Sequence, residues 1–165
     1  MRTLLDLARY NAWANQRVFA TSAALSSAVL SAEAKGTYGS VQETLAHLVE
    51  VEEIYLLMLQ ERNLQGWDSD EFMTHDAAWF VQRSRELGTE YQSLLAGKDE
   101  SWLSDQFVVP WFGFPISRRD GLLQAWTHSA QHRSQILSEL GSHGLQPPDI
   151  DYIFMRSEEQ EGEGS

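Results

Sequence analysis

The chain of 165 residues contains no cysteine. Disulfide bonds, thiolate metal ligands and a cysteine nucleophile are therefore excluded, which leaves His, Asp and Glu as metal ligands. The sequence also lacks any apolar run near the roughly 18 residues of a membrane-spanning helix, and Asp6 and Asn11 interrupt any signal-peptide core. We therefore expect a cytoplasmic protein with no membrane partner.

Basic residues are scarce. The chain has 12 Lys and Arg against 24 Asp and Glu, which gives a formal net charge of −12 and a pI near 4.7. This balance argues against a protein that binds phosphate backbones, so we expect no nucleic-acid partner. The length suits one domain, which we assign to residues 1–156, and the glutamate-rich stretch 157–165 is expected to be a disordered acidic tail.

Several common functional motifs are absent as well. The sequence contains no G-x-x-x-x-G-K-[ST], no G-x-G-x-x-G and no G-x-S-x-G. A phosphate-binding loop, a dinucleotide-binding turn and the usual serine-hydrolase nucleophile therefore have no support.

What the sequence does contain is four long amphipathic segments. Apolar residues recur at helical spacing over about residues 2–24, from Ser40 onward, from Asp76 to Gly97, and from Ser117 to Gly141. Residues 26–39 form a polar loop, and the aromatic, proline-containing stretch 107–117 favours extended chain or a short hairpin. With no βαβ alternation, the pattern predicts an all-α four-helix bundle. Its long connection before the last helix lets the topology depart from simple up-and-down order.

The last helix contains two histidines, His128 and His132, in the stretch HSAQHRSQIL. Residues four apart lie about 6 Å from each other on one side of a helix, so both imidazoles can reach one metal ion at about 2.0–2.1 Å. A helical wheel places Leu123, Ala130 and Leu137 on the inward face and the two histidines at its edge. The same spacing is compatible with ordinary surface or boundary residues.

A third candidate ligand is His47, which shares a helix face with aliphatic residues. Taken alone, it is interpreted as an ordinary core or boundary histidine. His75 and His143 lie beside expected helix ends, where we interpret them as solvated or capping. Zincin and di-iron templates do not fit, because no Glu lies between the paired histidines and no histidine follows Glu at the required spacing.

These segments resemble the DinB/YfiT-like family of metal-binding four-helix bundles. The resemblance rests on YNAWANQRV in the first helix, GSVQETLAHLVEVEE around His47, WFGFPISRRDGLLQAWTH, and HSAQHRSQIL followed by PPDIDY. It implies a helical bundle, often dimeric, with a divalent site made of three histidines. His47 matches the lone ligand of the second helix, and His128 and His132 match the pair of the last one.

The resemblance also suggests a chemistry. Three imidazoles suit Zn or Ni, with Fe or Mn as alternatives, and leave room for an exchangeable ligand. Relatives in the family include thiol-dependent transferases and isomerases, so the implied partners are a low-molecular-weight thiol and a small electrophile, and the expected assembly is a homodimer. A metal that activates water in place of a thiol would make the protein a hydrolase. The competing hypothesis is a non-enzymatic, stress-associated protein that binds a metal or small ligand through a structural site.

Roles for residues around the histidines stay open at this stage. Glu52 orients a ligand, holds Arg or Asn from the first helix, or forms a salt bridge at the rim. Asn11, Asn15 and Arg17 are expected to bridge helices rather than serve a ligand, and Arg133 to extend into solvent rather than recognise a carboxylate. Trp13 and Trp126 are interpreted as core or interface aromatics.

Overall fold

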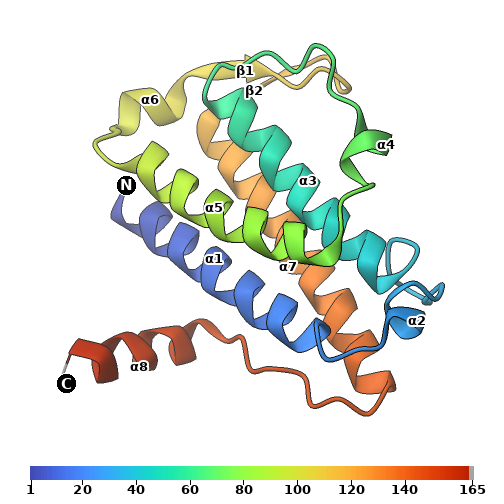
Figure 1. Ribbon diagram of the computed structural model, residues 1–165. Helices are drawn as coiled ribbons and strands as arrows, with labels where there is room; N and C mark the ends of the chain where they lie inside the picture. Colours follow the sequence, from blue (N-terminus) through green and yellow to red (C-terminus); the bar gives the residue numbers. More distant parts are fainter. Residues whose placement is uncertain (164–165) are drawn as a thin grey trace.

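The computed structural model describes residues 1–163, and four long helices form its body (Figure 1). These are α1 (Arg2–Ser22), α3 (Val41–Leu59), α5 (Ala77–Leu95) and α7 (Arg118–Ser142). The connections contain the short helices α2 (Ser27–Leu30), α4 (Ser69–Phe72) and α6 (Glu100–Ser104) and the strands β1 (Gln106–Val108) and β2 (Pro115–Ser117), and α8 (Tyr152–Glu163) follows the last long helix. The prediction of an all-α four-helix bundle is confirmed.

The order of the four long helices around the bundle differs from their order in the chain. The pairs α1/α5, α5/α3, α3/α7 and α7/α1 pack side by side, so α1 lies diagonal to α3 and α5 lies diagonal to α7. In a simple up-and-down bundle every pair of successive helices would be adjacent. The connections before α3 and before α7 span these diagonals. The sequence indicated such a departure only for the long connection before the last helix.

Two capping boxes fix where α3 and α7 begin. The Ser40 hydroxyl accepts a hydrogen bond from the Glu43 amide while the Glu43 carboxylate accepts one from the Ser40 amide, as the sequence predicted. Ser117 and Asp120 form the same reciprocal pair at α7. Each box satisfies backbone N–H donors that a helix end leaves unpaired. It therefore fixes the residue at which the helix begins.

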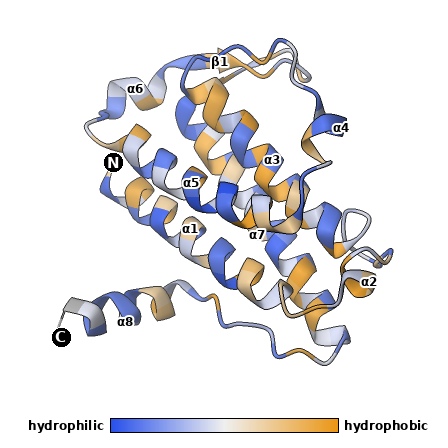
Figure 2. Ribbon diagram, in the orientation of Figure 1, coloured by the Kyte–Doolittle hydropathy of each residue, from blue (hydrophilic) through white to orange (hydrophobic). Residues whose placement is uncertain are grey.

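The core lies between the four helices, along each of which apolar and polar residues alternate (Figure 2). Val18 of α1, Leu48 and Leu56 of α3, Leu87 of α5 and Ile136 of α7 are all fully buried. Among residues 1–163, none of the helices combines the length and hydropathy that a bilayer-spanning segment needs.

The connection between α5 and α7 ends in a small hairpin. Strands β1 and β2 pair antiparallel, with Phe107 opposite Ile116, which confirms the expectation of a hairpin at 107–117. Val109 is buried and anchors the start of the loop, and Gly113 supplies the left-handed backbone angle, φ +72°, that turns the chain.

The structure corrects the inward face that we assigned to α7. Leu123 and Ala130 are exposed and Leu137 is only partly buried, whereas the buried stripe runs through Leu122, Ala125, Trp126, Ser129, His132, Arg133, Ile136 and Leu140. The expectation that Arg133 extends into solvent is therefore wrong, since this residue is 1% exposed. The helical wheel gives the wrong inward face because the buried stripe includes polar side chains, and these have hydrogen-bond partners inside the bundle.

The expected disordered tail is also corrected. We predicted disorder over 157–165, but residues 157–163 continue α8, which starts within the domain assigned to 1–156. Residues 164–165 lie outside the described part of the chain. Met155 is buried, and Glu158 accepts hydrogen bonds from Trp13 and Arg17 of α1. The helix forms because its start docks on α1, which acidic composition alone did not indicate.

Candidate metal centre

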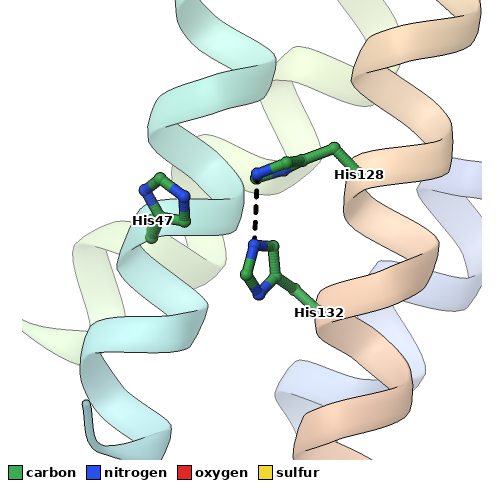
Figure 3. Close-up of side chains that lie close together, drawn as sticks. All are labelled: His47, His128 and His132. Atoms are coloured by element: carbon green, nitrogen blue, oxygen red, sulfur yellow. Dashed lines mark hydrogen bonds between the residues drawn. The ribbon is translucent and has the colours of Figure 1, made fainter. Parts of the chain in front are cut away.

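The three predicted ligands converge on one point between α3 and α7 (Figure 3). His47 comes from α3, and His128 and His132 come from successive turns of α7. One nitrogen from each ring lies within 4.8 Å of the others. The α7 pair meets a histidine from α3 because α3 and α7 are adjacent in the bundle. The structure thus places together the three residues that the sequence singled out.

Two polar side chains orient these rings. The Nδ1 atom of His132 lies 2.7 Å from the side-chain amide oxygen of Gln135, which can accept a proton carried by that nitrogen. The Nδ1 atom of His47 lies 3.6 Å from a carboxylate oxygen of Glu50. A carboxylate or amide oxygen behind a histidine is the usual support of a metal ligand, because it leaves the Nε2 lone pair free.

The ring of His47 is held on its face as well. Tyr38 stacks on it with ring centroids 4.1 Å apart and planes inclined by 12°. The Thr44 hydroxyl lies within hydrogen-bond distance of both the amide and the carbonyl of Tyr38, so the loop before α3 is fastened to its first turns. Sequence reasoning missed Tyr38, Glu50 and Gln135; the position of Glu50 one turn after His47 was the available signal.

The paired Nε2 atoms of α7 give the clearest indication of a cation site. Nε2 of His128 and Nε2 of His132 lie 3.1 Å apart. In the tautomer with the proton on Nδ1, the Nε2 atom of His132 is an acceptor that can face either the proton of His128 or a cation. Burial and then the neighbouring His132 and His47 lower the pKa of His128 to about 4. The pKa of His132 is lowered as well, and burial is the largest cause.

This donor set fits a divalent metal ion. Both α7 imidazoles are neutral at neutral pH, which is the form that binds metals, and the group brings together three ring nitrogens. Three protein ligands match open, catalytic-type coordination better than a closed structural site, which has four. The Nδ1 atom of His128 is buried and has no partner among the described residues, so the support of this ligand is less complete.

A pocket of about 320 Å³ opens beside the histidines. Its lining consists of His47, Glu50, Val51, Ile54, Tyr55, Ser69, Trp111, Phe112, Gln124 and His128. Two of the three histidines therefore face the pocket. Burial raises the pKa of the Tyr55 phenol, so this hydroxyl stays protonated at neutral pH.

Glu50 is the one carboxylate in this lining, and it is almost fully buried. Burial raises the pKa of its carboxyl, but the polar groups of the neighbouring His47 and Ser69 and the hydrogen bond from Trp67 outweigh that effect and hold the pKa below its ordinary value. Glu50 is therefore ionised at neutral pH and places a fixed negative charge beside His47.

Glu52 belongs to a separate polar cluster inside the bundle. Its Oε1 atom accepts hydrogen bonds from Asn11 and Asn15 of α1 and from the Ser129 hydroxyl, at 2.7, 2.9 and 2.5 Å. Of the three alternatives considered for this residue, holding asparagines of the first helix is the correct one. Asn11 and Asn15 bridge helices as expected, and sequence reasoning missed Ser129.

The remaining histidines lie apart from this centre, as predicted. His75 is exposed and stacks on Trp79, with ring centroids 3.9 Å apart. His143 is exposed at the end of α7, where its Nε2 atom lies 3.1 Å from Glu139. Neither is part of the histidine cluster, so both are suitable control positions for experiments on the metal site.

Comparisons with known proteins agree with this fold. The model of the DinB family matches residues 1–163. Among solved structures, YfiT from Bacillus subtilis, described as a probable metal-dependent hydrolase with an unusual four-helix bundle topology, is similar with a TM-score of 0.69 and 13% sequence identity. The match covers 85% of this chain and 87% of that chain. No curated protein matches the sequence.

Proposed function

The chain belongs to the DinB family, and from this premise and the histidine cluster we propose that it is a metal-dependent enzyme. The observation that carries the proposal is the convergence of His47, His128 and His132 within 4.8 Å beside a pocket of about 320 Å³. A metal site of three histidines can accept a further ligand, and a neighbouring pocket can hold a substrate next to it.

The expected ion is Zn or Ni, because imidazole nitrogen suits these metals; Fe, which imidazole also binds, and Mn are the alternatives. Such an ion acts as a Lewis acid and favours the deprotonated form of a water or a thiol at neutral pH. Gln135 and Glu50 keep two of the imidazoles oriented for binding. The Tyr55 phenol supplies a protonated hydroxyl in the same pocket.

We propose a low-molecular-weight thiol or water as the nucleophile and a small electrophile as the second substrate. The family resemblance favours the thiol, whereas the description of YfiT as a probable metal-dependent hydrolase favours water. A cytoplasmic location and a homodimer are our further expectations from the resemblance.

A structural metal site is the second candidate function. It is favoured by one observation, namely that the histidines come from both α3 and α7, so that a bound ion would cross-link two helices of the bundle. Against it, the histidine cluster offers three ligands and adjoins a pocket.

The first test is the metal content of the purified, untagged chain after reconstitution with Zn or Ni. We expect about one equivalent per chain in the wild type and in His75→Ala, and close to none in His128→Ala. His75 is the control because it is an exposed histidine outside the cluster. Equal metal content in all three proteins, or none in the wild type, would refute the site.

The second test separates the two candidate functions and the two nucleophiles. Turnover of activated esters and of alkylating electrophiles is measured with and without added thiol, in the wild type and in His132→Ala. Turnover lost in a folded His132→Ala protein supports the enzyme, and its dependence on thiol decides between transfer and hydrolysis. Metal-dependent folding without any turnover would instead support the structural site.

A further inference from the structure

Three aromatic side chains stand exposed on the loop of the β1–β2 hairpin. Trp111, Phe112 and Phe114 are 52%, 60% and 53% exposed. The backbone beneath them is fixed, since β1 and β2 pair on either side and Val109 is buried. Large apolar side chains on an anchored loop indicate a binding surface, because a protein gains nothing for its fold by exposing them.

Two of the three aromatic residues belong to the pocket beside the histidines. Trp111 and Phe112 line it together with His47 and His128, whereas Phe114 does not. Trp111 also contacts Tyr55 of α3 edge to face, with ring centroids 6.3 Å apart and planes at 87°. The loop therefore forms one wall of the pocket, and Val51 and Ile54 of α3 add aliphatic surface to it.

The charge of this pocket restricts what it can bind. Its lining contains one acidic side chain, Glu50, and, among the described residues, no Lys or Arg. The whole chain has a net charge of −12. A ligand carboxylate that does not reach the metal ion would lose its hydration there without gaining a cationic side chain as a partner, so an anionic group on that part of the ligand is disfavoured.

We propose that Trp111 and Phe112 bind the aromatic or other flat apolar portion of an uncharged substrate, whose polar group faces the histidine cluster. This inference rests on the proposed function, since it takes the substrate to lie beside the metal site. It adds the substrate class: neutral and aromatic or strongly apolar, rather than a carboxylate.

A small molecule fits these observations better than a second copy of the chain. The aromatic wall and two of the candidate metal ligands, His47 and His128, line the same pocket. The volume of this pocket, about 320 Å³, lies within the range of small-molecule sites, roughly 300–1,000 Å³.

The test uses Zn-loaded full-length protein and three hydroxamates, which are metal-binding probes that differ only in the attached group. Affinities for acetohydroxamate, benzohydroxamate and 4-carboxybenzohydroxamate are measured by calorimetry. We expect benzohydroxamate to bind about tenfold more tightly than acetohydroxamate, because its ring is buried against the aromatic wall. The added carboxylate should remove most of that gain.

Single substitutions test whether the aromatic wall of Trp111 and Phe112 causes the preference for benzohydroxamate. Trp111→Ala and Phe112→Ala should lower the affinity for benzohydroxamate about tenfold and leave acetohydroxamate unchanged. Phe114→Ala is the comparison variant: Phe114 has similar exposure on the same loop and stacks on Phe112 but does not line the pocket, so its substitution should have a smaller effect. Equal affinity of the two uncharged probes, or an equal effect of all three substitutions, would overturn the inference.

Two further outcomes separate this inference from the proposed function. A wild type that binds no Zn overturns both, whereas a wild type that binds Zn without preference for the aromatic probe overturns only the inference. Sedimentation of the same variants tests whether a second copy of the chain, rather than a small molecule, covers the aromatic wall. If Trp111→Ala dissociates a dimer and leaves probe affinity unchanged, the wall is an interface between copies of the chain, and the inference is wrong.

Discussion

Arg133 carries its charge into the interior of the bundle. Its Nη1 atom donates hydrogen bonds to the side-chain oxygens of Asn11 and Asn15, at 2.7 and 2.6 Å. The amide nitrogens of the same two asparagines donate to Glu52. The asparagines thus connect the guanidinium to the carboxylate, and this network joins α1, α3 and α7. Burial lowers the pKa of Arg133, and the charge of Glu52 acts in the opposite direction.

Removal of Glu52 alone should therefore be costly. We expect Glu52→Gln to lower the free energy of unfolding by about 3–5 kcal/mol, because the charge of Arg133 stays buried without its compensating carboxylate. The measurement is urea denaturation of metal-free protein, which avoids the added stability from a bound ion.

The double variant Glu52→Gln/Arg133→Met is the control for this prediction. Because it removes both charges, it should be more stable than Glu52→Gln alone. Losses that simply add in the double variant would show that the two charges are not coupled.

Single residues differ in how well the sequence predicts them. His128 and His132 were found because their spacing is itself a metal-binding pattern, and His47 because of the family resemblance. The burial of Arg133 could not be predicted from its own position, because its partners come from a helix more than a hundred residues earlier. Tyr38 was missed for the same kind of reason, since its role depends on a stacking contact across a loop.

Among the helices, α1 and α5 approach each other closely at Gly88. A Cβ atom added there would lie 2.6 Å from the Cβ of Ala12, which no real pair of side chains tolerates. Glycine costs helix propensity in the middle of α5, so its value here is the close packing that it permits.

Gly88→Ala should destabilise the protein in spite of the better helix propensity of alanine. We expect a net loss of about 1–3 kcal/mol in the free energy of unfolding, because α1 and α5 must move apart. Gly141→Ala is the matched control: this glycine is also helical, but its added Cβ would make only ordinary contact with Pro147 at 3.7 Å. Urea denaturation should show Gly141→Ala at or above wild-type stability; equal losses in both variants would contradict the packing argument.

The sequence predicts long elements better than short ones. The beginnings of α3 and α7 follow from their capping boxes, and the four long helices from their periodicity. The short helices α2, α4 and α6 were not predicted, although Ser26, Asp68 and Asp99 cap them. Elements of four or five residues are too short to show a helical period, so only their caps could have indicated them.

For the whole molecule, the bundle order decides where the three histidines of the candidate site meet. The sequence predicts a departure from up-and-down order but not which helices become neighbours. Because α3 and α7 are adjacent, their histidines meet, and because α5 lies diagonal to α7, the connection between these two helices is long. That connection carries the hairpin whose aromatic residues line the pocket. The order of the four long helices depends on how all of them pack together. The hydrophobic pattern of a single helix does not encode this order.

The C-terminal helix α8 tests whether this site is independent of the rest of the molecule. It packs against α1, which is diagonal to α3, whereas the histidine cluster lies between α3 and α7. Its contacts are the buried Met155, a pair of rings from Tyr10 and Tyr152 with centroids 5.7 Å apart, and the bonds of Glu158 to α1.

A chain truncated after residue 150 should therefore keep its metal and lose some stability. Loss of the buried methionine is expected to cost about 1–3 kcal/mol, which lowers the melting temperature by about 2–10 °C. Glu158→Gln in the full chain should cost less than about 1 kcal/mol, because the contacts it removes are exposed to solvent. Metal content and thermal unfolding are measured on the same samples. If truncation abolished metal binding while the chain stayed folded, the site would depend on α8, and the assignment of metal binding to α3 and α7 alone would be wrong.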